Sequence, residues 1–179
     1  GTPQMTNTHW WRLLVFTKDM LIHNINRLLE VAPVIVPMVS GNHDTHTIFS
    51  LGEILKAYYH RTPHVQILNN YDRREYVHHG LCLLGYLHGH GIKPADVHNL
   101  FLKDVPELIG VTKYRAMRMG HFHKNKRNKL IMTLDKDEFM GIDVEICPSL
   151  SPLDSWHDFK GFKGNLRRAK SWEWHSEYG

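Results

Sequence analysis

The sequence predicts an α/β protein in which helices and strands alternate first and strands prevail later. Apolar residues recur at helical spacing over about residues 7–30, and a short apolar run bounded by turn residues follows at 34–39. The 179 residues, 42% apolar and 22% charged, have the balance of a globular protein with a substantial core. We therefore expect a mixed sandwich of sheets and helices.

Each expected element follows from a local pattern. The first helix has one face formed by residues at helical spacing, namely Trp10, Leu13, Leu14, Thr17, Leu21, Ile25, Leu28 and Leu29. Prolines at 33 and 37 make the strand after it irregular. The remaining pattern predicts these elements in order: a helix over 48–59, a strand at 65–68, a strand pair at 74–79 and 81–87 turning at Gly80, a helix over 94–102, a strand ending at Met119, a polar turn at 124–128, strands at 130–134 and 140–147, and a weak edge strand over 167–175.

Composition narrows the class of protein. Cys82 and Cys147 lie in apolar strand-like segments, which indicates reduced core thiols. No apolar run approaches the roughly 20 residues that cross a bilayer, and no signal pattern opens the chain, so a cytoplasmic location without a membrane partner is expected. A net charge of +4 permits a polyanionic partner.

The turn SGNHDTH follows the first apolar strand and places an amide, an imidazole and a carboxylate side by side at Asn42, His43 and Asp44. Two explanations are open for these residues taken alone. Asn, Asp and Gly are ordinary turn residues, and Asp44, Thr45 or Thr47 can cap the helix that follows. Alternatively, the three side chains serve a ligand at the end of the strand.

Histidines also mark the ends of later strands. Five of the fifteen histidines lie in loops after predicted strands: His43, His88, His90, His121 and His123. Such loops in an open α/β sheet bind ligands, because side chains from separate strands converge there. Neutral imidazole is the commonest metal ligand. A single H-x-H pair is a weak signal, but three such loops together predict a metal site.

Three blocks, taken in this order, resemble a known family. GNHD at 41–44, HGH at 88–90 and GHFH at 120–123 are similar to the last three signature blocks of the calcineurin-like metallophosphoesterases. The resemblance covers about residues 34–123 and is strongest to the DNA-repair exonuclease branch, which includes phage-encoded members. It implies an α/β/β/α sandwich of two mixed sheets flanked by helices, and metal-dependent phosphodiester hydrolysis.

The resemblance further implies a binuclear metal site. Asn42, His88 and His121 would ligate one ion, and His123 would ligate the other. A donor set rich in imidazole suits Mn²⁺, Fe²⁺ or Zn²⁺ better than Mg²⁺ or Ca²⁺. Family analogy favours two Mn²⁺ ions in the intact enzyme.

The phosphate would meet the remaining histidines. By the same resemblance, His43 would donate to the scissile phosphate or protonate the leaving oxygen, and Asp44 would orient its imidazole. The N-terminus of the following helix would add positive potential. His90 would contact a metal ligand without binding the metal itself, or it would contact the phosphate.

The sequence departs from the family in its first part. The family begins with D-x-H and G-D-x-x-D blocks, whose first Asp bridges the metals, but no D-x-H occurs before residue 41 and the only aspartate there is Asp19. We therefore expect residues 1–179 to form one incomplete metallophosphoesterase domain that lacks its first strands. Alone it should bind at most one divalent ion and be inactive, until the missing segment or a second copy completes it.

The segment 154–174 is both basic and aromatic. Arg167 and Arg168 can follow a phosphate backbone while tryptophans stack on bases. Alternatively, Trp172 and Trp174 form one buried strand face and the charges are merely solvated. DNA is the expected substrate; a small-molecule phosphodiesterase or phosphatase, and a non-catalytic module that binds metal or nucleic acid, are the alternatives.

Overall fold

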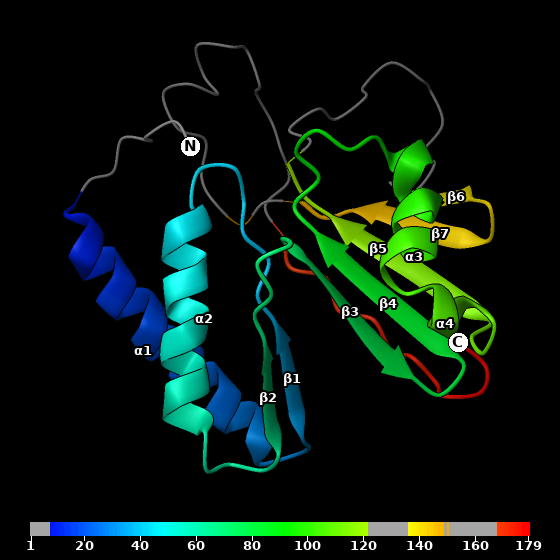
Figure 1. Ribbon diagram of the computed structural model, residues 1–179. Coiled ribbons are helices and arrows are strands. Elements are labelled where there is room, and N and C mark those ends of the chain that lie inside the picture. Colours follow the sequence, from blue (N-terminus) through cyan, green and yellow to red (C-terminus); the bar gives the residue numbers. More distant parts are fainter. Residues whose placement is uncertain (1–7, 122–135, 149, 151–167) are drawn as a thin grey trace. The chain divides into compact units, whose positions relative to one another are not determined.

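The computed structural model describes residues 8–121, 136–148, 150 and 168–179 (Figure 1). The chain divides into two compact units, Gly1–Glu75 and Tyr76–Gly179. A two-stranded sheet, a five-stranded sheet and several helices make this an α/β protein, as the sequence predicts. The metallophosphoesterase-type sandwich and the single domain stay predictions.

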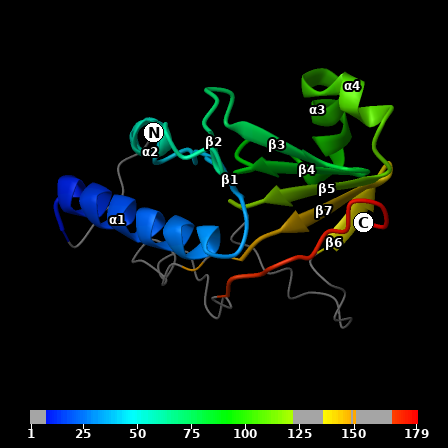
Figure 2. The ribbon, with the colours of Figure 1, turned by 90° about the horizontal axis from the view of Figure 1, so that it is seen from below.

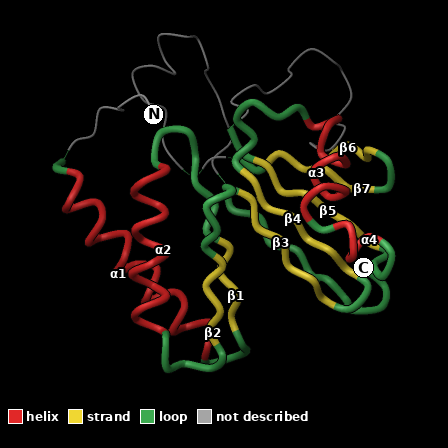
Figure 3. The backbone as a smooth tube through the Cα atoms, in the orientation of Figure 1, coloured by secondary structure: helices red, strands yellow, loops and turns green. Residues whose placement is uncertain are grey.

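The first unit holds two helices and a parallel pair of strands (Figure 3). Its elements are α1 (Trp10–Leu29), β1 (Val34–Pro37), α2 (Thr45–Tyr59) and β2 (Val65–Leu68). Val34 pairs with Val65, and Pro37 pairs with Leu68. Because the two strands are parallel, the turn after β1 and the residues after β2 leave the sheet at the same edge.

Apolar faces of both helices form the core of this unit. Ile25 of α1, Met38, and Leu51, Leu55 and Tyr59 of α2 are buried together. The Tyr59 hydroxyl lies 2.9 Å from Asn26 Oδ1, which ties α2 to α1. The helix predicted from apolar spacing is confirmed. Its predicted face is only partly covered: Leu14, Leu21, Ile25 and Leu29 pack inward, whereas Trp10, Leu13 and Leu28 are exposed.

A buried carboxylate closes the loop that precedes β3 (Arg74–His79). Glu75 is 1% exposed, and its carboxylate accepts hydrogen bonds from Asn70 N at 2.6 Å and Asn70 Nδ2 at 2.8 Å. Burial raises the pKa of Glu75, although the bonds from Asn70 act in the opposite direction. Its contribution to stability is therefore full below the unfolded pKa of about 4.3 and is lost as pH rises through the folded pKa.

Glu75→Gln is expected to remove this loss, because an amide stays neutral at every pH. We would measure the free energy of unfolding of both proteins with urea between pH 4 and 7. Its change with increasing pH should be more positive in Glu75→Gln than in the wild type. Glu53 provides the opposite case, since hydrogen bonds from Lys56 and Asn69 lower its pKa. Glu53→Gln should shift the slope the other way in measurements that extend below the unfolded pKa of about 4.3, where the Glu53 contribution is lost. Equal shifts for both variants would contradict this account.

The second unit is built on a sheet with strand order β3–β4–β5–β7–β6. Its further elements are β4 (Cys82–Leu87), η1 (Pro94–Asp96), α3 (Val97–Asp104), α4 (Pro106–Ile109), β5 (Tyr114–Met119), β6 (Lys136–Phe139) and β7 (Ile142–Ile146). Strands β4, β5 and β7 are parallel, whereas β6 runs antiparallel to β7. The boundary between the units falls inside β3.

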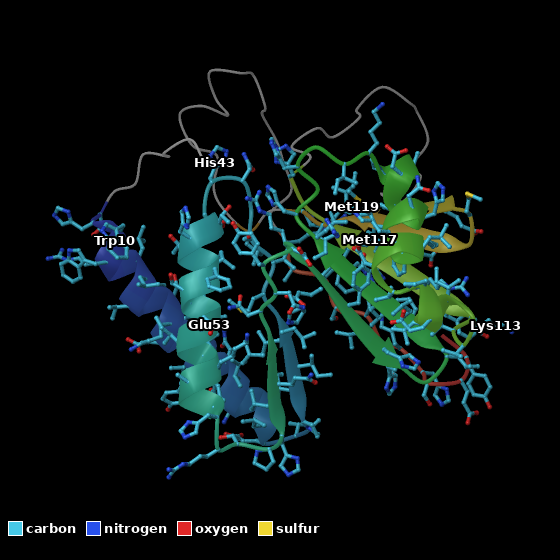
Figure 4. The ribbon with its side chains drawn as sticks, viewed as in Figure 1. Trp10, His43, Glu53, Lys113, Met117 and Met119 are labelled. Carbon is cyan, nitrogen blue, oxygen red and sulfur yellow. The ribbon has the colours of Figure 1, made fainter. Side chains whose placement is uncertain are left out.

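The two faces of this sheet differ in character. Leu83 and Leu87 of β4 and Met117 and Met119 of β5 pack with Phe101 of α3 in a buried apolar core (Figure 4). Helices α3 and α4 cover this face, and the C-terminal residues run along the opposite face (Figure 2). Because side chains alternate along a strand, Arg118 of β5 and Glu145 of β7 lie on the face next to the C-terminal residues.

Several sequence predictions are wrong in detail here. Met140, expected in a strand, forms a turn with Gly141; their φ values of 51° and 76° suit the two-residue turn that joins antiparallel β6 and β7. Strand β6 and helix α4 were not predicted. The polar turn at 124–128 and the strand at 130–134 lie outside the described residues.

The predicted C-terminal edge strand is also wrong over its described part. Residues 168–175 form no strand. The C-terminal segment bonds to the sheet through side chains and through single backbone contacts, such as Leu81 N to Ser176 O at 2.6 Å. Such isolated contacts do not make the repeated ladder that defines a strand.

The two cysteines are unpaired, as the sequence predicts. Both cysteines are free thiols, Cys82 buried and Cys147 half-buried, and burial raises the pKa of each. In the described part of the chain, no helix has the length and apolar character needed to cross a membrane.

Candidate functional site

Two histidine loops leave the five-stranded sheet side by side. The parallel register pairs Leu87 with Met119, so His88 and Gly120 emerge next to each other at the carboxyl ends of β4 and β5. Gly120 N donates to His88 O at 3.1 Å, which continues the pairing one step beyond the strands. The sheet register therefore brings the HGH block beside the start of the GHFH block.

The backbone of these loops is unusual. Gly89 and Gly91 have φ values of 95° and 77°, a region that glycine enters at little cost. His121 has a φ of 69°, which non-glycine residues rarely adopt, although histidine does so more often than most. Backbone strain of this kind clusters at functional sites, so His121 is a candidate functional residue on conformation as well as on chemistry.

His88, His121 and His90 form a chain of three imidazoles. His88 Nε2 lies 3.1 Å from His121 Nδ1, and His121 Nε2 lies 3.2 Å from His90 Nδ1. The rings meet edge to face, with centroids 4.9 and 4.8 Å apart. His121 is the central ring and uses both of its nitrogens, whereas His90 is exposed and the other two are half-buried.

Two explanations fit these distances between nitrogens: hydrogen bonds from ring to ring, or a metal ion bound between two of the rings. Neutral imidazole has one N–H and one lone pair, so the rings can donate to one another in sequence. Alternatively, an ion lies between His88 Nε2 and His121 Nδ1: two nitrogens bound at about 2.0–2.1 Å in tetrahedral geometry lie roughly 3.3 Å apart, close to the 3.1 Å found. The His121 Nε2–H would then donate to His90, which would fix its tautomer.

The cluster supplies two of the predicted metal ligands. Within the described residues no set of three or more histidine, cysteine, aspartate or glutamate side chains is arranged to hold an ion. Asn42, the predicted third ligand, belongs to the first unit, so its joining the cluster stays a prediction. His123 lies outside the described residues.

The GNHD turn is held by its own hydrogen bonds. Asp44 Oδ1 accepts from Gly41 N at 2.6 Å, and Thr45 Oγ1 donates to Gly41 O at 2.9 Å. Asp44 occupies the N-cap position of α2 without a side-chain bond to the helix, so the simple capping explanation does not describe its carboxylate. His43 is exposed on this turn (Figure 4), and its orientation by Asp44 stays a prediction.

A small cavity of about 40 Å³ lies beside this turn. Buried Ser40 and Asn69 and the side chain of His46 line it, at the carboxyl ends of β1 and β2. Asn69 Nδ2 donates to Phe49 O at 3.1 Å and to Glu53 Oε1 at 2.8 Å. Sequence reasoning missed these residues, although Asn69 directly follows a predicted strand and the same strand-end argument would have found it.

The predicted DNA contacts of the C-terminal segment are only partly described. Arg168 is exposed, whereas Arg167 lies outside the described residues. Lys170 forms an ion pair with Glu145, so it is not a merely solvated charge. Trp172 is exposed and Trp174 half-buried, so the alternative of a buried strand face is wrong.

No family model, curated protein or solved structure matches the chain. The metallophosphoesterase resemblance therefore rests on the three sequence blocks alone. The juxtaposition of His88 and His121 is the structural feature compatible with it.

Proposed function

We propose that this chain takes part in metal-dependent phosphodiester hydrolysis, with DNA as substrate. The observation that carries the proposal is the His88–His121 pair, two imidazole nitrogens 3.1 Å apart at the carboxyl ends of parallel strands. Open-sheet proteins bind ligands at this edge, and a pair of neutral nitrogens suits Mn²⁺, Zn²⁺ or Fe²⁺. Mn²⁺ is favoured by the resemblance.

Each described residue would have a distinct task. His88 and His121 would hold the ion, and His90 would hold the tautomer of His121 through its Nε2. A bound divalent ion polarises a phosphate and lowers the pKa of bound water. His43 would donate a proton to the phosphate or to the leaving oxygen, which typically contributes about 10² to 10⁴-fold in rate.

One divalent ion per chain is the expected stoichiometry, weakly held. Calorimetric titration with Mn²⁺ and Zn²⁺ should give one site that His88→Ala removes. His79→Ala is the matched control, because His79 is an exposed histidine of the same unit outside the cluster. Two tight sites in the 179-residue chain would contradict the expected loss of the second site.

Hydrolysis should be negligible in this chain alone, because the sequence lacks the block whose aspartate bridges the two metals in the similar family. Release of nitrophenol from a bis-nitrophenyl diester, and cleavage of a labelled oligonucleotide, measure it. Ligands for the second ion would have to come from another segment or from a second copy. Metal-dependent cleavage that His43→Ala abolishes would show instead that these 179 residues supply all the catalytic groups.

A non-catalytic metal-binding module is the second candidate. It is favoured by the departure from the family pattern, since the sequence lacks the D-x-H and G-D-x-x-D blocks before residue 41. Metal binding that persists without turnover, even with a second copy of the chain present, would support it. A panel of nucleotide and DNA substrates would separate a nuclease from a small-molecule phosphodiesterase or phosphatase.

A further inference from the structure

A groove of about 530 Å³ lies on the sheet face next to the C-terminal residues, within the second unit. Four aromatic side chains line it: Tyr114, Trp172, Trp174 and Tyr178. Pockets of roughly 300–1,000 Å³ that combine aromatic walls with a few polar groups are typical of small-ligand sites. The groove is separate from the imidazole chain, since it contains none of the three histidines.

A buried guanidinium lies in this groove. Arg118 is 8% exposed, and its Cζ lies 4.4 Å from the ring centre of Trp172 and 5.6 Å from that of Trp174. Its Nη1 is 3.5 Å from Glu145 Oε2 but has no hydrogen-bond partner among the described residues. A buried donor without a partner is rare and calls for an acceptor.

Trp172 is fixed in place yet remains open to solvent. Its Nε1 donates to Glu145 Oε2 at 2.9 Å, and Arg118 packs over the ring. The side chain is nevertheless 40% exposed. An indole that is held at its N–H and against a cation, with part of its surface exposed, is a ready platform for stacking.

The charges of the groove indicate a base rather than a phosphate. Three basic side chains line the groove, but Arg115 donates to the carbonyl oxygens of Ile109 and Thr112. Lys113 and Arg118 are then set against three acidic side chains, Glu138, Asp143 and Glu173. This balance gives no net attraction for an anion. Donors and acceptors around aromatic planes match the edges of a nucleobase, which also carry both.

We propose that this groove binds an unpaired nucleobase, stacked on Trp172, as part of a single-stranded nucleic acid. The choice of a nucleobase among planar heterocycles rests on the proposed function. Strand β5 connects the groove to the imidazole chain: Arg118 precedes His121 by three residues, about 10 Å along an extended strand. A single-stranded nucleic acid bound in the groove therefore has its phosphates within reach of the three imidazoles.

Fluorescence anisotropy of labelled oligonucleotides tests the proposal, with EDTA present so that metal plays no part. The full 179-residue chain should bind a single-stranded 12-mer of thymidines. An abasic 12-mer with the same number of phosphates should bind at least about tenfold more weakly, because stacking is lost. Equal binding of the two oligomers would overturn the proposal without the need for any variant.

Variants then locate the base. Trp172→Leu should weaken binding by about 5- to 140-fold, the range that base–aromatic stacking energies give. Trp172→Phe, which keeps a ring, should weaken it less. Trp10→Leu is the control, because Trp10 lies on α1 in the first unit and is 69% exposed (Figure 4). Equal effects of Trp172→Leu and Trp10→Leu would refute the site.

The two proposals can fail separately. Base-dependent binding in EDTA without any metal site would leave the groove standing and remove the proposed hydrolysis. If His88→Ala abolishes metal binding while normal and abasic oligomers bind equally well, the groove proposal fails and the metal site of the proposed function stands. If Trp172→Leu does not fold, as judged by circular dichroism, Trp172→Phe and the abasic comparison still decide the matter.

Discussion

Replacing His121 with glycine is expected to lower the affinity for a divalent ion by about 100-fold or more. Loss of a residue that hydrogen-bonds a metal ligand typically lowers metal affinity by about 10- to 100-fold, and loss of a ligand itself should lower it further. His121 is the ring that contacts both neighbours, through Nδ1 and through Nε2. Glycine suits its φ of 69°, so the loop should keep its conformation and the effect can be assigned to the missing imidazole.

Calorimetric titration with Mn²⁺ or Zn²⁺ measures this affinity. A ranking of variants makes the prediction more specific. His121→Gly should have the largest effect, His88→Ala the next, and His90→Ala a smaller one, because His90 acts through His121. The exposed His79→Ala should leave affinity unchanged. Unchanged affinity in His121→Gly would mean that the three rings form only a hydrogen-bonded chain.

Glu145→Leu is expected to destabilise the protein by about 3–5 kcal/mol, the usual cost of leaving a buried charge without its partner. Glu145 is 6% exposed and is the anionic partner of both Arg118 and Lys170. Its removal takes from Arg118, which is 8% exposed, the carboxylate that pairs with its guanidinium. The Trp172 N–H also loses its acceptor.

A double variant separates the loss of the partner from the loss of packing. Arg118→Met with Glu145→Leu removes both charges and should recover most of the lost stability, because methionine packs well against an indole. Urea denaturation at neutral pH measures both variants. Glu138→Gln, at an exposed carboxylate of β6, should change stability by less than about 0.5 kcal/mol. A double variant as unstable as Glu145→Leu would contradict this account.

Sequence patterns predicted the strand ends that carry the histidines, but not the contacts between the imidazoles. Apolar runs ending near Leu87 and Met119 predicted strands, and histidines directly after them predicted a shared edge. The parallel register confirms those strands and places His88 beside Gly120. A pattern in the sequence could not show that His121 contacts His90 with one nitrogen and His88 with the other, because that depends on the left-handed backbone at residue 121.

The sequence by itself determined the elements whose signal is local. The apolar period of α1 and the compact strand β2 were predicted within a few residues, because each depends on neighbours along the chain. Only tertiary structure decided β6 and the C-terminal segment. Strand β6 exists through its pairing with β7, and the segment at 168–175 is held to the sheet by Glu145 instead of extending it. Contacts between residues far apart in sequence outweigh local propensity in both cases.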